Sequence, residues 1–183
     1  MEWGSIAEII TAATAVVSAS IALWQYWHAN NVKRASYIET LLDKIKTDDV
    51  ISEMIYKFQY SEFKYDSNFH GGEEERKIDR TLLFFNYICY LREKHIISKA
   101  EFSFFEIEIS QALRSQDLID YLYNLYHFNC RVEGYKSKSA GLENSVYSHL
   151  LKYANSKGLL PDAFFDATAC RISGSHLHHY LNF

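Results

Sequence analysis

Three histidines crowd the C-terminal end of this 183-residue chain. His176, His178 and His179 lie in the segment SHLHHYLNF, where neighbouring imidazoles could converge on a transition-metal ion. Their spacing differs from the pattern with which zinc proteases present two histidines on one helical face, and no acidic residue lies nearby. We therefore expect a surface cluster with no bound metal and no other cofactor.

Arg171 and His176 are a second group of residues that could take part in a reaction. An Arg-x4-His spacing is within the signature of a superfamily of helical ribonucleases found in toxins and antiviral systems. Roughly one such match is expected by chance in a chain of this composition, and Gly174 between the two residues disfavours a helix that carries both. A membrane-tethered ribonuclease that uses Arg171 and His176 remains an alternative hypothesis.

Paired carboxylates offer little more. Glu75 and Asp79 share a helical face by their i,i+4 spacing, but basic neighbours indicate a solvated surface. Glu106 and Glu108 fall on different faces and do not converge locally. The chain also lacks a phosphate-binding loop, a nucleophile elbow and a Cys-x-x-Cys motif. These absences favour a protein that is not an enzyme.

Aromatic residues, 16% of the chain, are the most distinctive feature of its second half. They gather in two runs, residues 84–90 and 121–128, and a basic loop follows the second run. One interpretation is a large aromatic core. The other is a surface for a partner or a nucleotide, because aromatic rings stack on bases. This candidate surface consists of Tyr87, Tyr90, Tyr123, His127 and Arg131.

Composition sets the class of protein that must position these residues. One proline and seven glycines are too few for a turn-rich β sandwich or barrel. A net charge of -4 disfavours general nucleic-acid binding. Three widely spaced cysteines do not form a disulfide framework.

Hydrophobic spacing predicts helices with short connections. Asp48 and Ser115 are expected N-caps, and Ser98 with Glu101 forms a capping box. Residues 131–141 are polar and are expected to form a loop. The predicted helices cover residues 35–45, 48–58, 73–95, 98–113, 115–126 and 143–156, with a short one from residue 161.

The N-terminal segment differs from the rest. Residues 6–27 read IAEIITAATAVVSASIALWQYW and carry no charge after Glu8 until Lys33. Residues 9–27 would form a helix roughly 28 Å long, close to the thickness of a bilayer core. We expect an all-α protein with a transmembrane anchor over residues 1–30 and a cytoplasmic bundle of about six helices over residues 31–183.

The same segment is open to other interpretations. A cleaved signal peptide or a mitochondrial presequence would have a basic beginning, whereas Glu2 and Glu8 make this one acidic. A buried core helix remains open because Ala, Thr and Ser make the span only moderately apolar. A helix lying on the membrane surface needs a strongly polar face, and only Thr and Ser hydroxyls are available here.

Two patterns within the span predict its contacts. Aromatic side chains at both ends are typical of anchors at the membrane interface: Trp3, Trp24, Tyr26 and Trp27. Small residues recur on one helical face, where they would allow close helix packing and a homo-oligomer: Ala12, Ala15, Ala19 and Ala22.

The basic residues predict the orientation. Lys33, Arg34, Lys44 and Lys46 follow the span, and no Lys or Arg precedes it. The positive-inside rule then places the N-terminus outside and the domain in the cytoplasm.

One part of the chain resembles a group of known proteins. It is the run RTLLFFNYICYLREKHIISKAEFSFFEIEI, followed by DYLYNLYHF. An aromatic helix precedes the turn at residues 96–102, and a further aromatic helix follows. This order resembles small bacterial membrane proteins of unknown function with one N-terminal span and a helical cytoplasmic domain. Proteins of this build are often considered membrane-acting effectors of antiphage systems, which is the role that the resemblance implies.

The function expected from these features and from the resemblance is that of a non-enzymatic, single-pass protein of the bacterial inner membrane. Its partners would be the lipid bilayer, further copies of itself, and a protein or nucleotide signal received by the helical domain. A scaffold that tethers a partner protein to the membrane is a further alternative.

Overall fold

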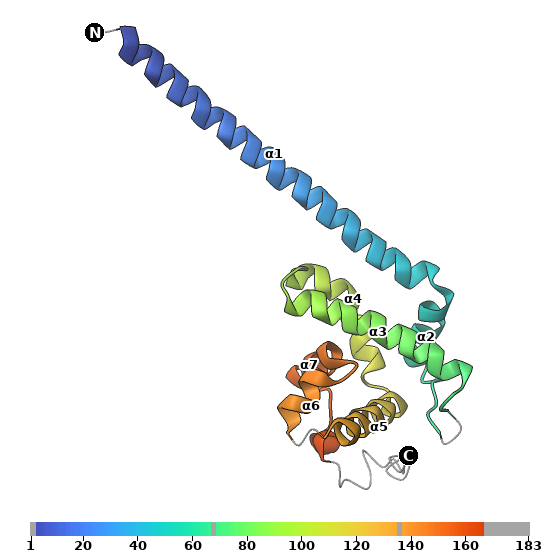
Figure 1. Cartoon of the computed structure of the whole chain (residues 1–183). Helices are drawn as coiled ribbons and strands as arrows, with labels where there is room; N and C mark the ends of the chain where they lie inside the picture. The colour runs from blue at the N-terminus through green and yellow to red at the C-terminus, as the bar shows by residue number, and fades with distance from the viewer. Residues whose placement is uncertain (1–2, 67–68, 135–136, 167–183) are drawn as a thin grey trace. The chain divides into compact units, whose positions relative to one another are not determined.

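A computed structural model describes residues 3–66, 69–134 and 137–166, without the side chains of residues 3–5 (Figure 1). These residues form helices and no strand, which confirms the expected all-α class with about six helices after the N-terminal one. The elements are α1 (Trp3–Thr47), α2 (Asp49–Gln59), α3 (Glu73–Glu93), α4 (Lys99–Ala112), α5 (Gln116–Glu133), α6 (Lys138–Asn144), α7 (Ser148–Ser156) and the 3-10 helix η1 (Asp162–Phe165).

Helix α1 is one continuous helix of 45 residues. The helix predicted over residues 35–45 is the C-terminal part of α1 and not a separate element. The chain divides into two compact units, Met1–Asp43 and Lys44–Phe183, and the second is called the helical unit. The predicted boundary at residue 30 falls inside α1.

Helix α3 is the centre of the helical unit and packs against α2, α4 and α7. The apolar side chains on one broad face of α3 are buried: Ile78, Leu82, Phe85, Ile88, Cys89 and Leu91. Burying each large apolar side chain contributes about 1.5–3 kcal/mol relative to leaving it exposed. Side chains from α4, α5 and α7 complete the core, among them Phe105, Ile109, Tyr121 and Leu150.

The predicted caps are present. The Asp48 carboxylate accepts a hydrogen bond from the Ile51 amide at 3.3 Å, and Ser115 accepts one from the Leu118 amide at 3.4 Å. Ser98 and Glu101 form the reciprocal capping box of α4. Each cap satisfies amide groups that the first helical turn leaves without partners.

Two predicted boundaries are wrong. Residues 131–141 are not one loop, because α5 continues to Glu133 and α6 begins at Lys138. The helix predicted over residues 143–156 is broken between α6 and α7, where Tyr147 leaves helical geometry and donates a hydrogen bond to Asp79. The Asn86 side chain on α3 then accepts the His149 and Leu150 amides and starts α7.

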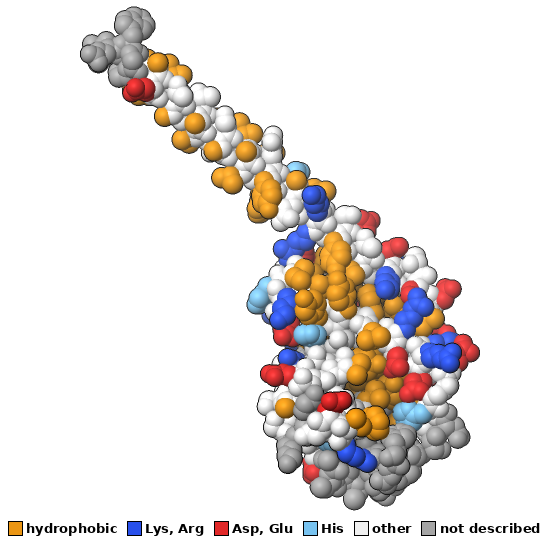
Figure 2. Space-filling view, viewed as in Figure 1, with side chains coloured by type: hydrophobic (Ala, Val, Ile, Leu, Met, Phe, Trp, Pro, Cys, Tyr) orange, Lys and Arg blue, Asp and Glu red, His pale blue; other side chains and the backbone are white. Residues whose placement is uncertain are grey.

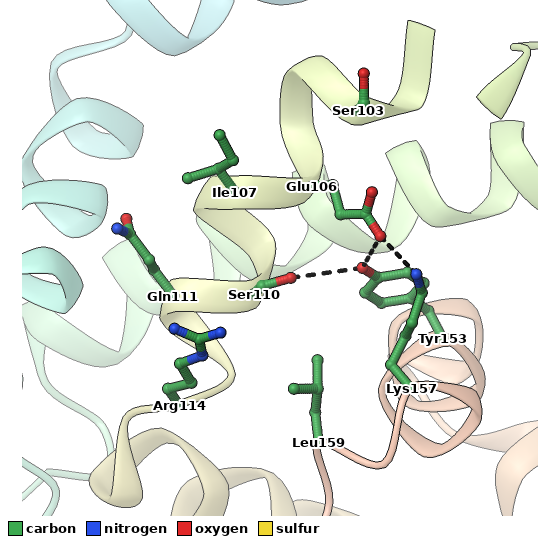
Figure 3. Close-up of a pocket in the computed structure, with 9 residues that line it drawn as sticks. All are labelled: Ser103, Glu106, Ile107, Ser110, Gln111, Arg114, Tyr153, Lys157 and Leu159. Atoms are coloured by element: carbon green, nitrogen blue, oxygen red, sulfur yellow. Dashed lines mark hydrogen bonds and ion pairs between the residues drawn. The ribbon is translucent and has the colours of Figure 1, made fainter. Parts of the chain in front are cut away.

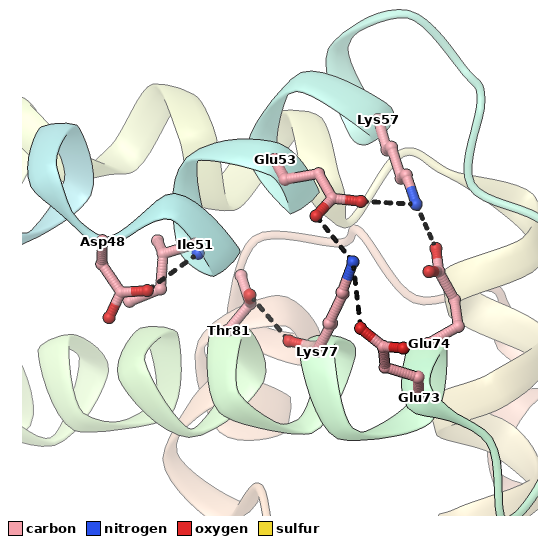
Figure 4. A network of polar contacts seen from close by, with 8 residues as sticks. All are labelled: Asp48, Ile51, Glu53, Lys57, Glu73, Glu74, Lys77 and Thr81. Carbon is pink, nitrogen blue, oxygen red and sulfur yellow. Dashed lines mark hydrogen bonds and ion pairs between the residues drawn. The ribbon is translucent and has the colours of Figure 1, made fainter.

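Ion pairs join α2 to α3 (Figure 4). The Glu53 carboxylate contacts Lys77 at 2.8 Å and Lys57 at 3.0 Å, and Lys57 also contacts Glu74 at 2.6 Å. Hydrogen bonds from Lys77 and Lys57 hold the pKa of Glu53 below its ordinary value. Because these groups are partly exposed, the pairs fix the relative position of the helices more than they add stability.

Candidate functional site

Helix α1 contains the one segment, among the described residues, that is long and apolar enough to cross a membrane by length and composition. None of its most apolar 18-residue stretch is buried in the structure. The exposed side chains include Ile9, Val16 and Leu23, each at least two-thirds accessible. A core helix of a soluble protein would bury such residues, so this observation disfavours the core-helix interpretation.

Three hydroxyl groups of the span are satisfied within the helix itself. Thr11, Thr14 and Ser20 each donate a hydrogen bond of 2.8 Å to the carbonyl oxygen four residues earlier. A hydroxyl bonded in this way does not need water or a polar partner. The weakly polar face seen in the sequence is therefore compatible with a lipid environment.

The predicted aromatic anchors are exposed at the C-terminal end of the apolar stretch. Trp24, Tyr26 and Trp27 are 64%, 74% and 66% exposed, and Trp24 stacks on the ring of His28 at 5.7 Å. The side chain of Trp3 lies outside the described part of the chain. In Figure 2 the charged side chains gather on the helical unit, and the span shows mainly hydrophobic and uncharged groups.

The predicted small-residue face is present on α1 and unoccupied by other described residues. Ala12, Ala15, Ala19 and Ala22 are all exposed. Self-association through this face stays a prediction.

A solvent-open hollow of about 670 Å³ lies between α4 and α7 in the helical unit (Figure 3). Its walls combine charged, amide, hydroxyl and apolar groups, which are the materials of a ligand site rather than of a packed core. The lining residues are Ser103, Glu106, Ile107, Ser110, Gln111, Arg114, Tyr153, Lys157 and Leu159.

Polar contacts cross this hollow from α4 to α7. The Glu106 carboxylate accepts hydrogen bonds from Lys157 at 2.7 Å and from the Tyr153 hydroxyl at 3.0 Å. The Ser110 hydroxyl lies 3.5 Å from the same Tyr153 oxygen. In Figure 3, Gln111 and Arg114 lie on the far side of Ser110 from this cluster, and the Gln111 side chain points away from it.

The protonation states of the cluster favour binding over acid–base catalysis. The hydrogen bond from Lys157 holds the pKa of Glu106 below its ordinary value, so the carboxylate is ionised at neutral pH. Burial raises the pKa of Tyr153 to about 12, so its hydroxyl keeps its proton. Neither group changes charge near neutral pH, as a general acid or base would.

The candidate ligand surface predicted from the aromatic runs is only partly a surface. Tyr87 is 44% exposed and stacks near Tyr90 on α3, with ring centroids 6.3 Å apart. Tyr123 and His127 on α5 are 2% and 6% exposed. Tyr123 and His127 are therefore core residues, and their assignment to a surface is corrected. Arg131 at the end of α5 is exposed.

His127 has a structural role in this core. Its Nε2 atom lies 2.7 Å from the carbonyl oxygen of Phe164, and its ring contacts Tyr123 at 4.3 Å. Burial lowers the pKa of His127, so the neutral ring donates to the carbonyl group and holds η1 against α5.

The solvated surface expected at Glu75 and Asp79 is wrong. The Asp79 carboxylate accepts hydrogen bonds of 2.6 Å from both Tyr121 and Tyr147, whose rings are buried. Glu75 is bonded to His70 at 2.8 Å. The i,i+4 spacing was visible in the sequence, but the tyrosines that bind Asp79 come from α5 and the turn before α7, so no local signal could reveal them.

The remaining chemical candidates lie outside the described residues. Arg171 and His176 fall there, as do His178 and His179, so neither the ribonuclease pair nor the histidine cluster has a described geometry. Among residues 3–66, 69–134 and 137–166, no group of three or more His, Cys, Asp or Glu side chains is arranged to hold a metal ion.

Comparison with known proteins adds no family to this description. No protein-family model matches the chain, and no curated protein or solved structure matches it either.

Proposed function

We propose that the chain is a non-enzymatic membrane protein that α1 anchors in the bilayer through residues 6–27. The observation that carries this proposal is an apolar helical stretch of which no residue is buried and in which Thr11, Thr14 and Ser20 bond to their own backbone. Leaving large apolar side chains in water forgoes about 1.5–3 kcal/mol for each one. A lipid environment removes that cost along the whole stretch.

The proposed topology puts the helical unit on the cytoplasmic side of a bacterial inner membrane. Lys33, Arg34, Lys44 and Lys46 all follow the span, as the positive-inside rule requires of a cytoplasmic flank. In this position the helical unit would receive a protein or nucleotide signal.

The proposed action takes place at the membrane, as in an antiphage effector, through assembly of the small-residue face. Two copies of α1 that pack on Ala15 and Ala19 could bring their backbones close together, because alanine side chains are small. Signal-dependent assembly of several such helices would then perturb the bilayer.

Membrane potential tests this action. Induced expression in a bacterium, with a potential-sensitive dye, should show depolarisation or a growth defect for the wild-type chain. The double variant Ala15→Ile/Ala19→Ile should lose this effect, because it fills the small-residue face. Ala13→Ile adds a similar bulk on the opposite side of α1 and should keep it. No depolarisation and no growth defect, with or without phage challenge, would refute the effector role.

A further inference from the structure

A second hollow, of about 320 Å³, lies where α3 ends, α4 begins and α7 ends. Its volume is at the lower end of the range for small-molecule sites, about 300–1,000 Å³. The ring of Tyr153 lies on its wall and packs edge to face on Phe102, with ring centroids 5.2 Å apart. The hollow therefore has room for a small molecule and an aromatic surface for it to contact.

Three basic side chains from one short stretch of the chain line this second hollow. Arg92 lies in the last turn of α3, His95 lies in the connection, and Lys99 is the first residue of α4. Among the described residues, no ion pair and no side-chain hydrogen bond involves any of these three side chains. They are therefore available to a ligand.

The carboxylates that line the second hollow are bonded to other side chains. Glu106 accepts hydrogen bonds from Lys157 and Tyr153 (Figure 3), and Glu93 is bonded to His149 Nδ1 at 2.6 Å. These hydrogen bonds hold the pKa of each carboxyl group below its ordinary value, so both are ionised.

Positive charge remains in excess around the second hollow. Arg92, Lys99 and Lys157 outnumber the two carboxylates, and His95 adds to the excess whenever it is protonated. The net charge of the whole chain is -4, so this excess does not follow from overall composition. A hollow with such an excess attracts anions.

The backbone of His95 has a conformation that glycine usually adopts. Its φ angle is 57°, its amide donates to the Arg92 carbonyl group at 3.2 Å, and the Ile96 amide donates to the Leu91 carbonyl group at 2.9 Å. These bonds form a Schellman motif, in which the left-handed residue is most often glycine. A side chain strains the backbone at this position, so the stability of the turn does not explain the imidazole. A ligand in the hollow would give it a role.

We propose that the second hollow binds a small phosphomonoester. Arg92, His95 and Lys99 contact the phosphate group, because a guanidinium group pairs with two phosphate oxygens and the other two side chains donate single hydrogen bonds. The organic group lies against the ring of Tyr153, since a phosphate ion alone would leave much of the hollow empty. This inference rests on the proposed function, because it names the chemical class of a signal that the helical unit would receive.

Calorimetric titration of the full-length protein in a non-ionic detergent tests the site. The probes are phenyl phosphate, inorganic phosphate and phenol at matched ionic strength. Phenyl phosphate should bind with a Kd below about 1 mM and more tightly than inorganic phosphate, whereas phenol should not bind. Arg92→Gln and Lys99→Gln should each weaken the binding of phenyl phosphate by about tenfold, the loss of one charge-assisted contact.

His95→Gly separates a binding role from a structural one. Glycine relieves the backbone at this position, so the variant should melt at a higher temperature than the wild type. The same variant should bind phenyl phosphate about tenfold more weakly, because the imidazole contact is lost. A higher melting temperature with unchanged binding would contradict the role assigned to His95.

Lys94→Gln is the matched control, because Lys94 is an exposed lysine of the same turn that does not line the second hollow. This variant should bind phenyl phosphate as the wild type does. The proposal is overturned if phenyl phosphate does not bind, if phenol binds as well, or if Lys94→Gln weakens binding as much as Arg92→Gln. Binding in detergent does not require insertion, so its failure leaves the membrane proposal standing, and failed insertion leaves the binding result standing.

Discussion

Removal of the Asp79 carboxylate should strongly destabilise the helical unit. This group accepts hydrogen bonds of 2.6 Å from Tyr121 and Tyr147, which are 0% and 3% exposed. Asp79→Ala removes the acceptor of both phenol hydroxyls, whose rings are buried. Each hydroxyl that loses its acceptor costs about 1–3 kcal/mol, so the free energy of unfolding should fall by about 2–6 kcal/mol.

Thermal unfolding of the full chain in detergent, followed by near-ultraviolet circular dichroism, measures this effect. Because about 1 kcal/mol shifts the melting temperature by roughly 2–4 °C in a chain of this size, Asp79→Ala should melt at least about 4 °C lower. Tyr121→Phe removes one of the two bonds and should lose less. Glu143→Ala removes an exposed carboxylate and should leave the melting temperature unchanged. Equal shifts for Asp79→Ala and Glu143→Ala would refute the reasoning.

Three further predictions concern the same unit. Ser98→Ala removes the capping box of α4 and should lower the free energy of unfolding by about 0.5–2 kcal/mol in urea unfolding, whereas the exposed Ser52→Ala should not. The pKa values of Glu53 and Glu106 are lowered in the folded protein, so their ionised forms stabilise the fold above pH 4.5, and this stabilisation is lost as the pH falls further. Glu106→Gln should therefore reduce the dependence of the melting temperature on acid pH. An unchanged pH profile in this variant would contradict the role assigned to Glu106. Burial raises the pKa of Cys89, so iodoacetamide should modify this thiol only in denatured protein, as mass spectrometry can show.

Features that depend on neighbouring residues could be predicted from the sequence. The capping box at Ser98 involves residues three positions apart, and the apolar face of α3 repeats every turn. The apolar span could also be predicted, because its length and its lack of charge are properties of consecutive residues.

Features that depend on distant residues could not be predicted. Tyr147 and Asp79 are 68 positions apart, and the Asn86 side chain caps α7 from 63 positions away. The hollow between α4 and α7 likewise joins residues of two helices that have no common sequence motif. Its lining combines Arg114 with Lys157, which no spacing rule connects.

The aromatic runs show why composition alone leaves core and surface unresolved. Tyr87 and Tyr123 have similar neighbours in the sequence, yet one is 44% exposed and the other 2%. The face of each helix that meets another helix decides this difference, and only the packing of the whole unit sets that face.

In the proposed topology, α1 crosses the membrane and the helical unit lies in the cytoplasm. Labelling with a membrane-impermeant maleimide tests it most directly, in spheroplasts that express single-cysteine variants of a chain whose native cysteines are replaced. Glu2→Cys should label in intact spheroplasts, and Ser139→Cys, at an exposed position of α6, should label only after permeabilisation. Labelling of both positions only after permeabilisation, or of Ser139→Cys alone before it, would contradict the account.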